Sequence, residues 1–373
     1  MTLHELLEVA ARAGCEAQQP DGSFAPGRNG PYGDRETPVR NTGHWLVALL
    51  AAWQRTGQAS FCAAAEAALS HLLSDKARPE GASFWHRLGP GKDRCNGLVG
   101  QAWTLEALAT AADTLGSLEA AELAERVFLL HPFDERVGLW RRVETDGRDL
   151  GFDPTLNHQL WFAAAGSLLA ASADAEVARR VARFVACLPR NLALRRDGLV
   201  RHWVAPFGLA RRSRREAIRH WVVSVREAPA LAGKEVGYHA FNLYALALLR
   251  LHLPDAGFWR SAAFARLWGA ARGPAFRAAV DTNVHGWPYN PTGIEMAFAL
   301  DVFEGRASRT EQAAWLSEQI ARHWDARARA LRRATPDPET LAARLYEATR
   351  LPDLPLPEPA LARCAPPARG ASR

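Results

Sequence analysis

The stretch KDRCNGLVGQAWTLEALATAADTLG, Lys92 to Gly116, joins two different kinds of sequence. It begins with charged residues, a thiol and an amide, and it continues as a long helix rich in alanine and leucine. Apolar residues cover nearly every face of this helix, so other helices must enclose it. A polar group therefore stands at the entrance of a buried helix, and the same junction recurs along the chain.

Helical periodicity runs through most of the sequence, and strong strand alternation is missing. The predicted helices are of two kinds, which alternate. One kind is apolar nearly all round and is predicted to lie inside, at residues 41–53, 96–112, 157–172, 237–251 and 290–303. The other kind is charged along one side and is predicted to form an outer wall, at residues 60–75, 117–131, 174–188, 257–272 and 309–333.

Short turns lead from each inner helix to its outer partner, whereas long loops with glycine and aromatic residues lead back. This order places the long loops at one rim. With helical segments near both ends of the chain, about twelve helices form roughly six hairpins. An open solenoid would expose one flank of every repeat, so enclosed inner helices favour a closed ring. We predict an all-α (α/α)6 toroid as one domain over residues 1–350, followed by a proline-rich tail over residues 351–373.

Asparagine recurs where the inner helices are predicted to begin, as Asn41, Asn96, Asn157 and Asn290, and Asn242 lies one turn into the fourth. The side-chain oxygen of asparagine commonly accepts a hydrogen bond from a free backbone N–H, so we expect helix caps here. Parallel inner helices also direct their positive N-terminal ends into a shared funnel. The funnel is expected to hold an anionic or hydroxyl-rich ligand.

Composition indicates an ordinary globular protein, with 48% hydrophobic and 23% charged residues. No apolar run reaches the roughly 18 residues that a membrane span needs. The N-terminal segment carries Glu5 and Glu8 where a signal peptide would be apolar. We therefore expect a cytoplasmic protein with no membrane insertion.

Charge and cysteine usage argue against two further classes of partner. The net charge is +6, but nearly all the basic residues are arginines scattered over helix faces, which argues against nucleic-acid binding. One cluster, Arg211–His220, is either a solvated helix face or a contact for an acidic ligand. The five cysteines are widely spaced and form no CxxC motif, so we expect no metal and no cofactor.

The predicted rim gathers imidazoles, amides, carboxylates and indoles. Indole faces beside polar groups suit pyranose rings, which offer C–H faces and hydroxyl edges. Each residue also has a structural explanation, as a cap, a core indole or a loop hydrogen bond, and it is the convergence that indicates a sugar site. The residues predicted to bind substrate are His44, Trp45, Trp85, Arg94, Asn96, Trp103, His158, Gln159, Trp161, His202, Glu235, His239, Asn242, His285, Trp287, Tyr289 and Asn290.

Two carboxylates are predicted to be catalytic. Asp93 lies between Lys92 and Arg94, which would keep it ionised and held in place. Asp149 lies in a glycine-flanked loop that could approach a ligand closely. Each of them could instead serve only to order its loop.

The chain resembles the six-hairpin glycosidase superfamily, and within it the unsaturated glucuronyl and rhamnogalacturonyl hydrolases. RDLGF, residues 148–152, is similar to an acidic loop of that family, and residues 92–108 are similar to an inner-helix start that contains Asn-Gly. The resemblance implies a glycoside hydrolase that acts on an acidic, uronate-containing oligosaccharide or surface glycan. It also implies Asp149 as the proton donor and Asp93 as the second carboxylate, with pKa values that differ.

Other readings of the same rim remain open. A sugar epimerase or isomerase would depend on His158, His239 and His285. A polysaccharide lyase could use the same fold, and a glycan-binding scaffold would use the rim without turnover. A zinc-dependent lanthionine-type cyclase lacks its second rim cysteine beside Cys95, and a terpene cyclase lacks its DDxxD or DxDD motif.

Overall fold

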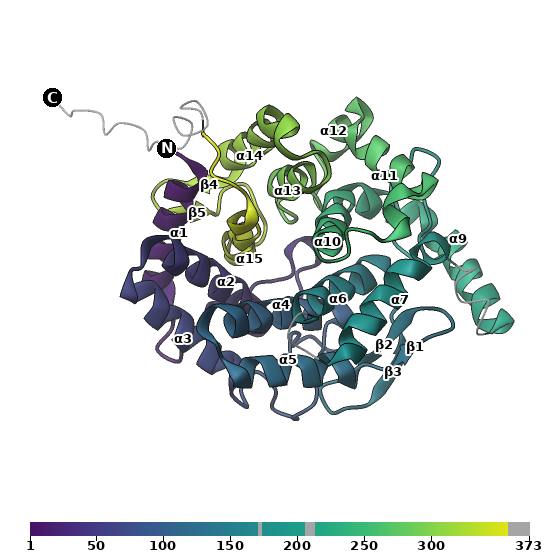
Figure 1. The fold of residues 1–373 in the computed structure, drawn as a ribbon, viewed down its shortest axis with the longest axis horizontal. Coiled ribbons are helices and arrows are strands. Elements are labelled where there is room, and N and C mark those ends of the chain that lie inside the picture. The colour runs from purple at the N-terminus through teal and green to yellow at the C-terminus, as the bar shows by residue number, and fades with distance from the viewer. Residues whose placement is uncertain (171–173, 206–212, 357–373) are drawn as a thin grey trace.

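The computed structural model describes residues 1–170, 174–205 and 213–356, and it confirms a closed ring of helices. Each inner helix contacts the next, and the last segment returns to the first, so the ring closes (Figure 1). The inner segments are α2 (Val39–Thr56), α4 (Gly97–Leu115), α6 (Leu156–Leu169), α10 (His239–His252), α13 (Thr292–Glu304), and finally α15 (Pro338–Ala343) with the 3-10 helix η4 (Arg344–Arg350).

Amphipathic helices form the outer wall, as predicted. In α7, Val177, Val181 and Phe184 are buried at helical spacing, while Arg179 and Arg183 face outward. The outer helices are α1 (Leu3–Ala17), α3 (Ala59–Leu73), α5 (Leu118–Leu130), α7 (Ala175–Asn191), α11 (Ala262–Arg272), with the short α12 (Pro274–Val280) after it, and α14 (Arg309–His323). Further 3-10 turns are η1 (Gly30–Tyr32), η2 (Gly257–Arg260) and η3 (Gly305–Ser308).

The expected asparagine caps are wrong. Asn41 lies inside the first turn of α2 and donates to Ala25 O, and Asn157 lies inside α6. Asn96 does occupy the N-cap position of α4, but its side chain makes no capping bond and its backbone is left-handed, with φ 57°. Asn290 lies ahead of α13 and donates to His285 O and Gly237 O. The side-chain amides of Asn41 and Asn290 thus bond to backbone carbonyls of neighbouring segments, and they do not cap the helices.

Two segments form short strands that the sequence reading missed. β1 (Phe133–Asp134), β2 (Leu139–Val143) and β3 (Asp149–Phe152) make an antiparallel sheet within one long loop. The predicted outer helix over residues 309–333 ends at His323, where β4 (Trp324–Asp325) begins and pairs with β5 (Ala330–Leu331). These strands have two to five residues, too few for period-two alternation to stand out from the helical pattern.

The start of the proline-rich tail packs against the N-terminus. Leu354 O accepts from Leu3 N, Leu356 N donates to Met1 O, and both leucines are buried. The predicted tail from residue 357 onward lies outside the described residues. Domain boundaries at residues 350 and 351 thus remain a proposal.

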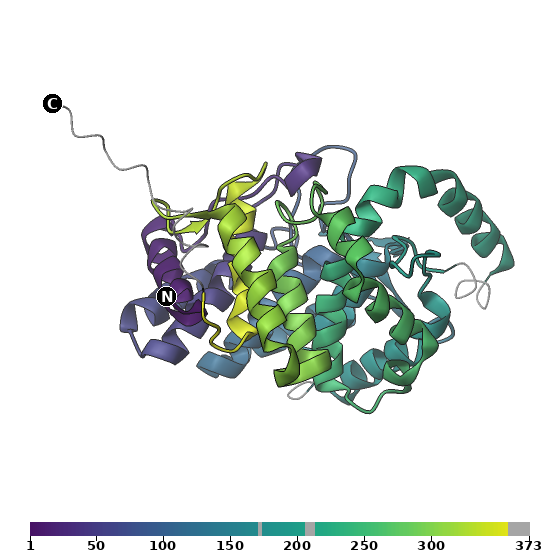
Figure 2. The same ribbon diagram turned by 90° about the horizontal axis from the view of Figure 1, so that it is seen from above.

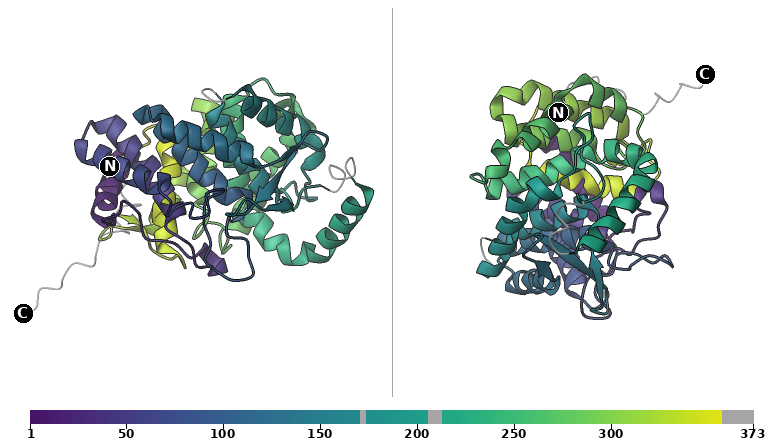
Figure 3. Two further views of the ribbon diagram at one scale, coloured as in Figure 1. Left: turned by 90° about the horizontal axis from the view of Figure 1, so that it is seen from below. Right: turned by 90° about the vertical axis from the view of Figure 1, so that its right-hand side faces the viewer.

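One helix departs from the ring. α9 (Arg214–Gly237) projects from the body on the side that carries the long loops (Figures 2 and 3). It holds the described part of the predicted arginine cluster; Arg211 and Arg212 lie outside the described residues. Across the described ranges, every helix falls short of the combined length and apolar character that a membrane span requires.

Candidate functional site

A cavity of about 170 Å³, open to solvent, lies where the inner helices begin. Loops ahead of α2, α4, α6, α10 and α13 all contribute to its wall, so segments far apart in the chain meet there. The lining residues are Asn29, Tyr32, Asp34, Arg87, Lys92, Asn96, Val99, Trp103, Thr155, Asn157, His158, His202, Lys234, Tyr238, Phe241 and Tyr289.

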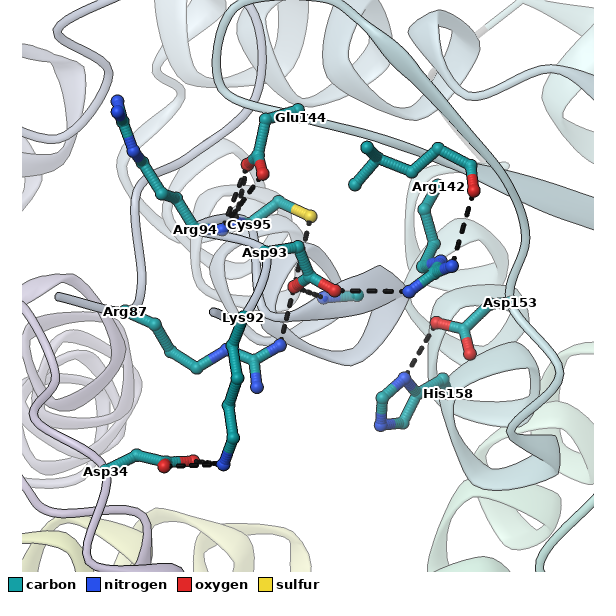
Figure 4. Close-up of polar contacts among 12 residues, drawn as sticks. Asp34, Arg87, Lys92, Asp93, Arg94, Cys95, Arg142, Glu144, Asp153 and His158 are labelled. Carbon is teal, nitrogen blue, oxygen red and sulfur yellow. Dashed lines mark hydrogen bonds and ion pairs between the residues drawn. The ribbon is translucent and has the colours of Figure 1, made fainter. Parts of the chain in front are cut away.

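A carboxylate–imidazole pair stands at the wall of this cavity. His158 Nδ1 lies 2.7 Å from Asp153 Oδ2, and Figure 4 shows the ring turned toward the open space. Asp153 is 2% exposed, whereas the side chain of His158 is 22% exposed. With Nδ1–H donated to the carboxylate, Nε2 is left to exchange a proton with a bound molecule.

Asp153 is held in its ionised form. Burial by itself would raise the pKa of this carboxyl, but the charge of His158 and its hydrogen bond outweigh burial and lower the pKa below its ordinary range. Leu98 N at the start of α4 donates to Oδ2 at 3.1 Å, and Thr155 N donates to Oδ1 at 3.1 Å. The pair therefore consists of a fixed anion and a positioned imidazole.

The left-handed Asn96–Gly97 step makes room for this pair. Both residues have φ 57°, a conformation that glycine adopts readily and other residues rarely do. A Cβ on Gly97 would lie 2.6 Å from Asp153 Oδ2 and 2.6 Å from His158 Nδ1. The polar entrance of the apolar helix α4 is thus the point where its backbone meets the carboxylate–imidazole pair.

Asp93 forms an ion cluster beside the cavity. Its carboxylate lies 2.5 Å from Arg87 Nη2 and 3.2 Å from Arg142 Nη1, and it accepts from Gly97 N at 2.9 Å (Figure 4). Burial would raise the pKa of Asp93, but the Arg87 charge and the hydrogen bonds prevail and lower it. Asp93 thus orients Arg87, which lines the cavity.

The neighbouring backbone is held by a second carboxylate. Glu144 accepts from Arg94 N and Cys95 N, each at 3.1 Å, so the loop that carries Asp93 is fixed from both sides. Burial raises the pKa of the Cys95 thiol well above its ordinary value, which leaves it a neutral core group.

Two of the three lysines in the chain line the cavity. Lys92 Nζ lies 2.6 and 2.8 Å from the two oxygens of Asp34, which also accepts from Asn29. Lys234 Nζ lies 4.8 Å from the centre of the Tyr32 ring, and no ion pair of Lys234 is seen among the described residues. Lys234 therefore offers the cavity a cation whose charge is not already matched by a carboxylate.

Tyrosines and the neutral histidine His202 complete the wall, and His285 packs against Tyr32 and Tyr238 without lining the cavity. The hydroxyls of Tyr32 and Tyr238 are 3.1 Å apart, and Tyr289 donates to Asn29 Oδ1 at 2.7 Å. Burial lowers the pKa of His202 to about 3 and that of the adjacent His285 to about 4, so both rings are neutral at pH 7.

Below the cavity, Arg40 lies 3.9 Å over the Trp103 ring and forms an ion pair with Glu36 at 3.2 Å. His44 stacks on Tyr346 with ring centroids 4.5 Å apart. Within the described ranges neither ring nitrogen of His44 has a hydrogen-bond partner. Burial lowers the pKa of His44 well below its usual value, and nearby arginines add to the effect.

The structure brings five of the predicted substrate-binding residues to the cavity, namely Asn96, Trp103, His158, His202 and Tyr289. Asp149 lies elsewhere. Its side chain is 42% exposed on β3, and it pairs with Arg141 at 2.7 Å. Arg94 is likewise exposed and pairs with Glu80 at 2.6 Å. Neither Asp149 nor Arg94 is part of the cavity wall.

Four predicted indoles pack within the protein. Trp45 stacks on Phe24, Trp161 stacks on Phe241 and Tyr244, and Trp287 stacks on Trp315. Trp85 donates to the carbonyl oxygen of Arg87 at 2.7 Å. These indoles support loops and helices, and they do not line the cavity.

Predicted polar residues at the inner-helix starts also have structural partners. Gln159 bonds the backbone of Trp140, and His239 accepts from Val200 N and bonds Leu267 O. Glu235 accepts from His202 N at 3.1 Å. Asn290 and Asn242 are buried; Asn290 accepts from Arg344 at 2.5 Å, and Asn242 Oδ1 has no partner among the described residues.

Sequence reasoning missed the cationic and phenolic part of the wall. Its members are Tyr32, Asp34, Arg87, Lys92, Lys234 and Tyr238. The rare residues of the chain could have indicated this part of the wall. Nearly all basic residues are arginines, but two of the three lysines line the cavity. Three of the five tyrosines line it as well. Within the described ranges, no group of three or more histidine, cysteine or acidic side chains is placed to hold a metal ion.

Fold comparison defines a class of protein. The chain superposes on D-mannose isomerase with a TM-score of 0.65, covering 93% of this chain and 95% of that one at 15% identity. Cellobiose 2-epimerase from Spirochaeta thermophila gives 0.61 over 96% and 97% at 14% identity. The GH76A α-1,6-mannanase from Salegentibacter gives 0.54 over 93% and 98% at 12% identity. The chain therefore shares the (α/α)6 toroid fold of these three enzymes.

A curated relative gives the family. Archaeal glycosylation protein Q from Haloferax volcanii is 45% identical over 364 residues, covering 94% of this chain and 98% of the relative. The chain belongs to the family of this glycosylation protein. No protein-family model matches it.

Proposed function

We propose that this protein is an acid–base enzyme that isomerises or epimerises an acidic sugar. The observation that carries the proposal is the Asp153–His158 pair at the cavity wall, with a buried anion behind a partly exposed imidazole. In this proposal His158 Nε2 takes a proton from the sugar carbon beside the carbonyl of the open-chain form. Return of a proton to a different position or face gives the isomer or epimer.

A neutral imidazole is suited to bind the carbonyl oxygen of the sugar. His202 lines the same cavity and is neutral at pH 7 because burial lowers its pKa to about 3. A neutral ring can hydrogen-bond a sugar oxygen as donor or acceptor. His202 would thus hold the carbonyl oxygen while His158 moves the proton.

The cations indicate an acidic substrate. Lys234 and Arg87 line the cavity with Lys92, and Lys234 has no ion pair among the described residues. A uronate carboxylate beside Lys234 would gain a charge-assisted hydrogen bond in a partly buried site. The kinship to a glycosylation protein and the fold shared with D-mannose isomerase and cellobiose 2-epimerase support a sugar substrate.

A glycoside hydrolase, with the specificity of unsaturated glucuronyl hydrolases, is the second candidate. The shared fold of the α-1,6-mannanase favours it. A hydrolase of this kind needs a carboxylic acid that keeps its proton near neutral pH. The pKa of Asp34, in the cavity wall, is lowered by the partners Lys92 and Asn29, which outweigh burial, and that of Asp93 is lowered as well. The carboxylates at the cavity are therefore poor proton donors, and the isomerase proposal accounts better for the site.

Deuterium exchange tests the two candidates together. Purified protein is incubated in D2O with reducing hexuronates and with the corresponding neutral hexoses, and products are followed by NMR and mass analysis. An isomerase or epimerase exchanges one carbon-bound hydrogen of a hexuronate and forms no new reducing end. Release of new reducing ends from saturated or unsaturated acidic oligosaccharides, without such exchange, would establish the hydrolase instead.

Substitution of the unpaired lysine tests the acidic substrate. Lys234→Met is expected to raise KM for the hexuronate about tenfold, since a charge-assisted hydrogen bond contributes roughly 1.5–3 kcal/mol, with a smaller change in kcat. Lys76→Met is the control, because Lys76 is exposed and pairs with Asp21 far from the cavity. Equal KM values for both variants would exclude Lys234 as the carboxylate contact.

A further inference from the structure

The projecting helix α9 carries an uncovered apolar stripe. Ile218, Trp221, Val222 and Val225 are 62%, 56%, 39% and 55% exposed. Their spacing of three, one and three residues places them on one face of the helix. Single exposed apolar residues are common on protein surfaces, but a contiguous row that includes tryptophan marks an interaction surface.

The rest of α9 shows that the stripe faces away from the body. Ala217 and Leu231 are buried, and His220 Nε2 bonds Val204 O at 2.7 Å. These residues lie on a different side of the helix from Ile218 and Val225. The helix is thus anchored along one side and at its C-terminal end, and it projects from the body of the protein (Figure 2).

Arginines border the stripe. Arg214, Arg215, Arg219 and Arg226 are exposed on the same helix. At 100° per residue, Arg215, Arg219 and Arg226 fall along one edge of the stripe, whereas Glu227 falls on the opposite side from Ile218. The helix therefore presents a basic and apolar face, the pattern of a helix that lies in the interface of an anionic membrane.

The position of α9 relates this face to the cavity. Lys234, in the last turn of α9, and Tyr238, directly after it, both line the cavity. The helix also projects on the side of the ring that carries the long loops (Figures 2 and 3). A surface bound by α9 would lie near the cavity rim.

We propose that α9 docks this protein on an anionic lipid surface. Tryptophan is favoured at the boundary of headgroups and acyl chains, and each arginine near an anionic surface adds to the attraction. A second copy of the chain fits less well, because a two-fold contact through this stripe would bring its arginines toward those of the partner. The docking lies in the interface and crosses no bilayer.

Vesicle co-sedimentation of the full-length protein tests the proposal. Vesicles of phosphatidylcholine with phosphatidylglycerol are expected to bind the protein, and vesicles of phosphatidylcholine alone to bind it at least about tenfold more weakly. The double variant Trp221→Ser/Val225→Ser is expected to lose about tenfold or more in binding. The double variant Arg215→Gln/Arg219→Gln is expected to lose a similar factor, with less dependence on salt.

Matched control variants distinguish docking through α9 from nonspecific binding to vesicles. Leu118→Ser removes a residue that is 77% exposed on α5, and Arg306→Gln removes an exposed arginine beside α13. Both are expected to bind vesicles like the wild type, and all variants to keep its circular dichroism spectrum. Wild-type protein that stays in solution with anionic vesicles would overturn the proposal. So would stripe variants that bind as tightly as the controls, or a dimer that the stripe variants dissociate while vesicle binding is absent.

Discussion

Two buried carboxylate clusters of this protein differ in what their basic partner can do. At the cavity, Asp153 pairs with His158, whose ring reaches solvent. Inside the ring, Arg344 lies 2.8 Å from Glu295 and 2.6 Å from Glu347, and all three side chains are at most 1% exposed. A histidine can exchange its proton near neutral pH, whereas a guanidinium cannot. Burial of charge thus serves structure in the second cluster and allows chemistry in the first.

The pKa values of the two clusters also shift in opposite directions. At the cavity, the pKa of Asp153 falls because its ionised form is paired and hydrogen-bonded. In the ring, burial raises the pKa of Glu347 to about 7 and that of Glu295 well above its ordinary value, although Arg344 opposes the rise. Two buried carboxyls share one guanidinium, so one of them retains a proton.

The largest expected effect is on turnover. His158→Gln is expected to lower kcat about 10²- to 10⁴-fold, the usual contribution of a general acid–base group. It should also lower the melting temperature, because it removes the charge that pairs with the buried Asp153. His252→Gln, at the C-terminal end of α10 and away from the cavity, is the matched control and should keep full activity. If the His158 variant turns over substrate at the wild-type rate, the Asp153–His158 pair is not catalytic.

The buried cluster of Arg344, Glu295 and Glu347 is expected to stabilise the fold. Arg344→Met leaves two buried carboxyls without their cation and should lower the free energy of unfolding by roughly 3–5 kcal/mol. Arg322→Met removes an exposed bridge to Asp281 and Glu318 and should cost about 1 kcal/mol or less. Urea unfolding followed by circular dichroism measures the free energy of unfolding of both variants. Equal losses would show that the buried cluster stabilises the fold no more than an exposed ion pair does.

The contact between α4 and the cavity pair can be tested with two glycines. Gly97→Ala and Gly116→Ala both place a side chain at positive φ, 57° and 68°, which should cost about 1–2 kcal/mol of stability. A Cβ at Gly116 meets open space, but one at Gly97 collides with Asp153 and His158. Loss of activity is therefore expected for Gly97→Ala alone. Activity retained in both variants would show that the pair does not need its present geometry.

The two clusters also predict opposite effects of pH on stability. Between about pH 4.5 and 7, folded protein keeps the Glu347 proton that unfolded protein releases, so this group lowers the free energy of unfolding as pH rises, by at most about 1.4 kcal/mol per pH unit. Glu347→Gln should reduce that slope, because only Glu295 then contributes to it. Asp153 acts in the opposite sense. Its stabilisation is full above its unfolded pKa near 3.8 and is lost as pH falls below that value, and Asp153→Asn should abolish the loss. Urea unfolding at a series of pH values distinguishes the two.

The inner helices were predicted well, but the direction of individual side chains was not. Gln159 and Trp161 lie in an inner helix and do not line the cavity, whereas the loop residues His202 and Tyr289 line it. Trp103 and His158 line the cavity from the second turn of α4 and the first turn of α6. Asp149 fell in the correct loop but on the exposed strand β3, where Arg141 holds it. Alternation along a strand turns successive side chains to opposite faces, so a loop position alone does not fix where a carboxylate points.

Side-chain contacts between loops of different hairpins could not be predicted from the sequence either. Tyr32 and Tyr238 are 206 residues apart in the chain, yet their hydroxyls are 3.1 Å apart. Asp153 was expected among the rim carboxylates but was not chosen as catalytic, although its bond to His158 spans only five residues. A short separation does not predict a contact when the intervening backbone leaves a loop and enters a helix.

The sequence by itself determined which helices are enclosed, their alternation with outer helices, and the rim at which the long loops meet. Those properties follow from periodicity and connection length, which are local and repeat along the chain. Only the tertiary structure decided which histidine meets a buried carboxylate and which lysine faces the cavity without an ion pair among the described residues. These choices depend on contacts between loops from different hairpins, and such contacts exist only once the ring has closed.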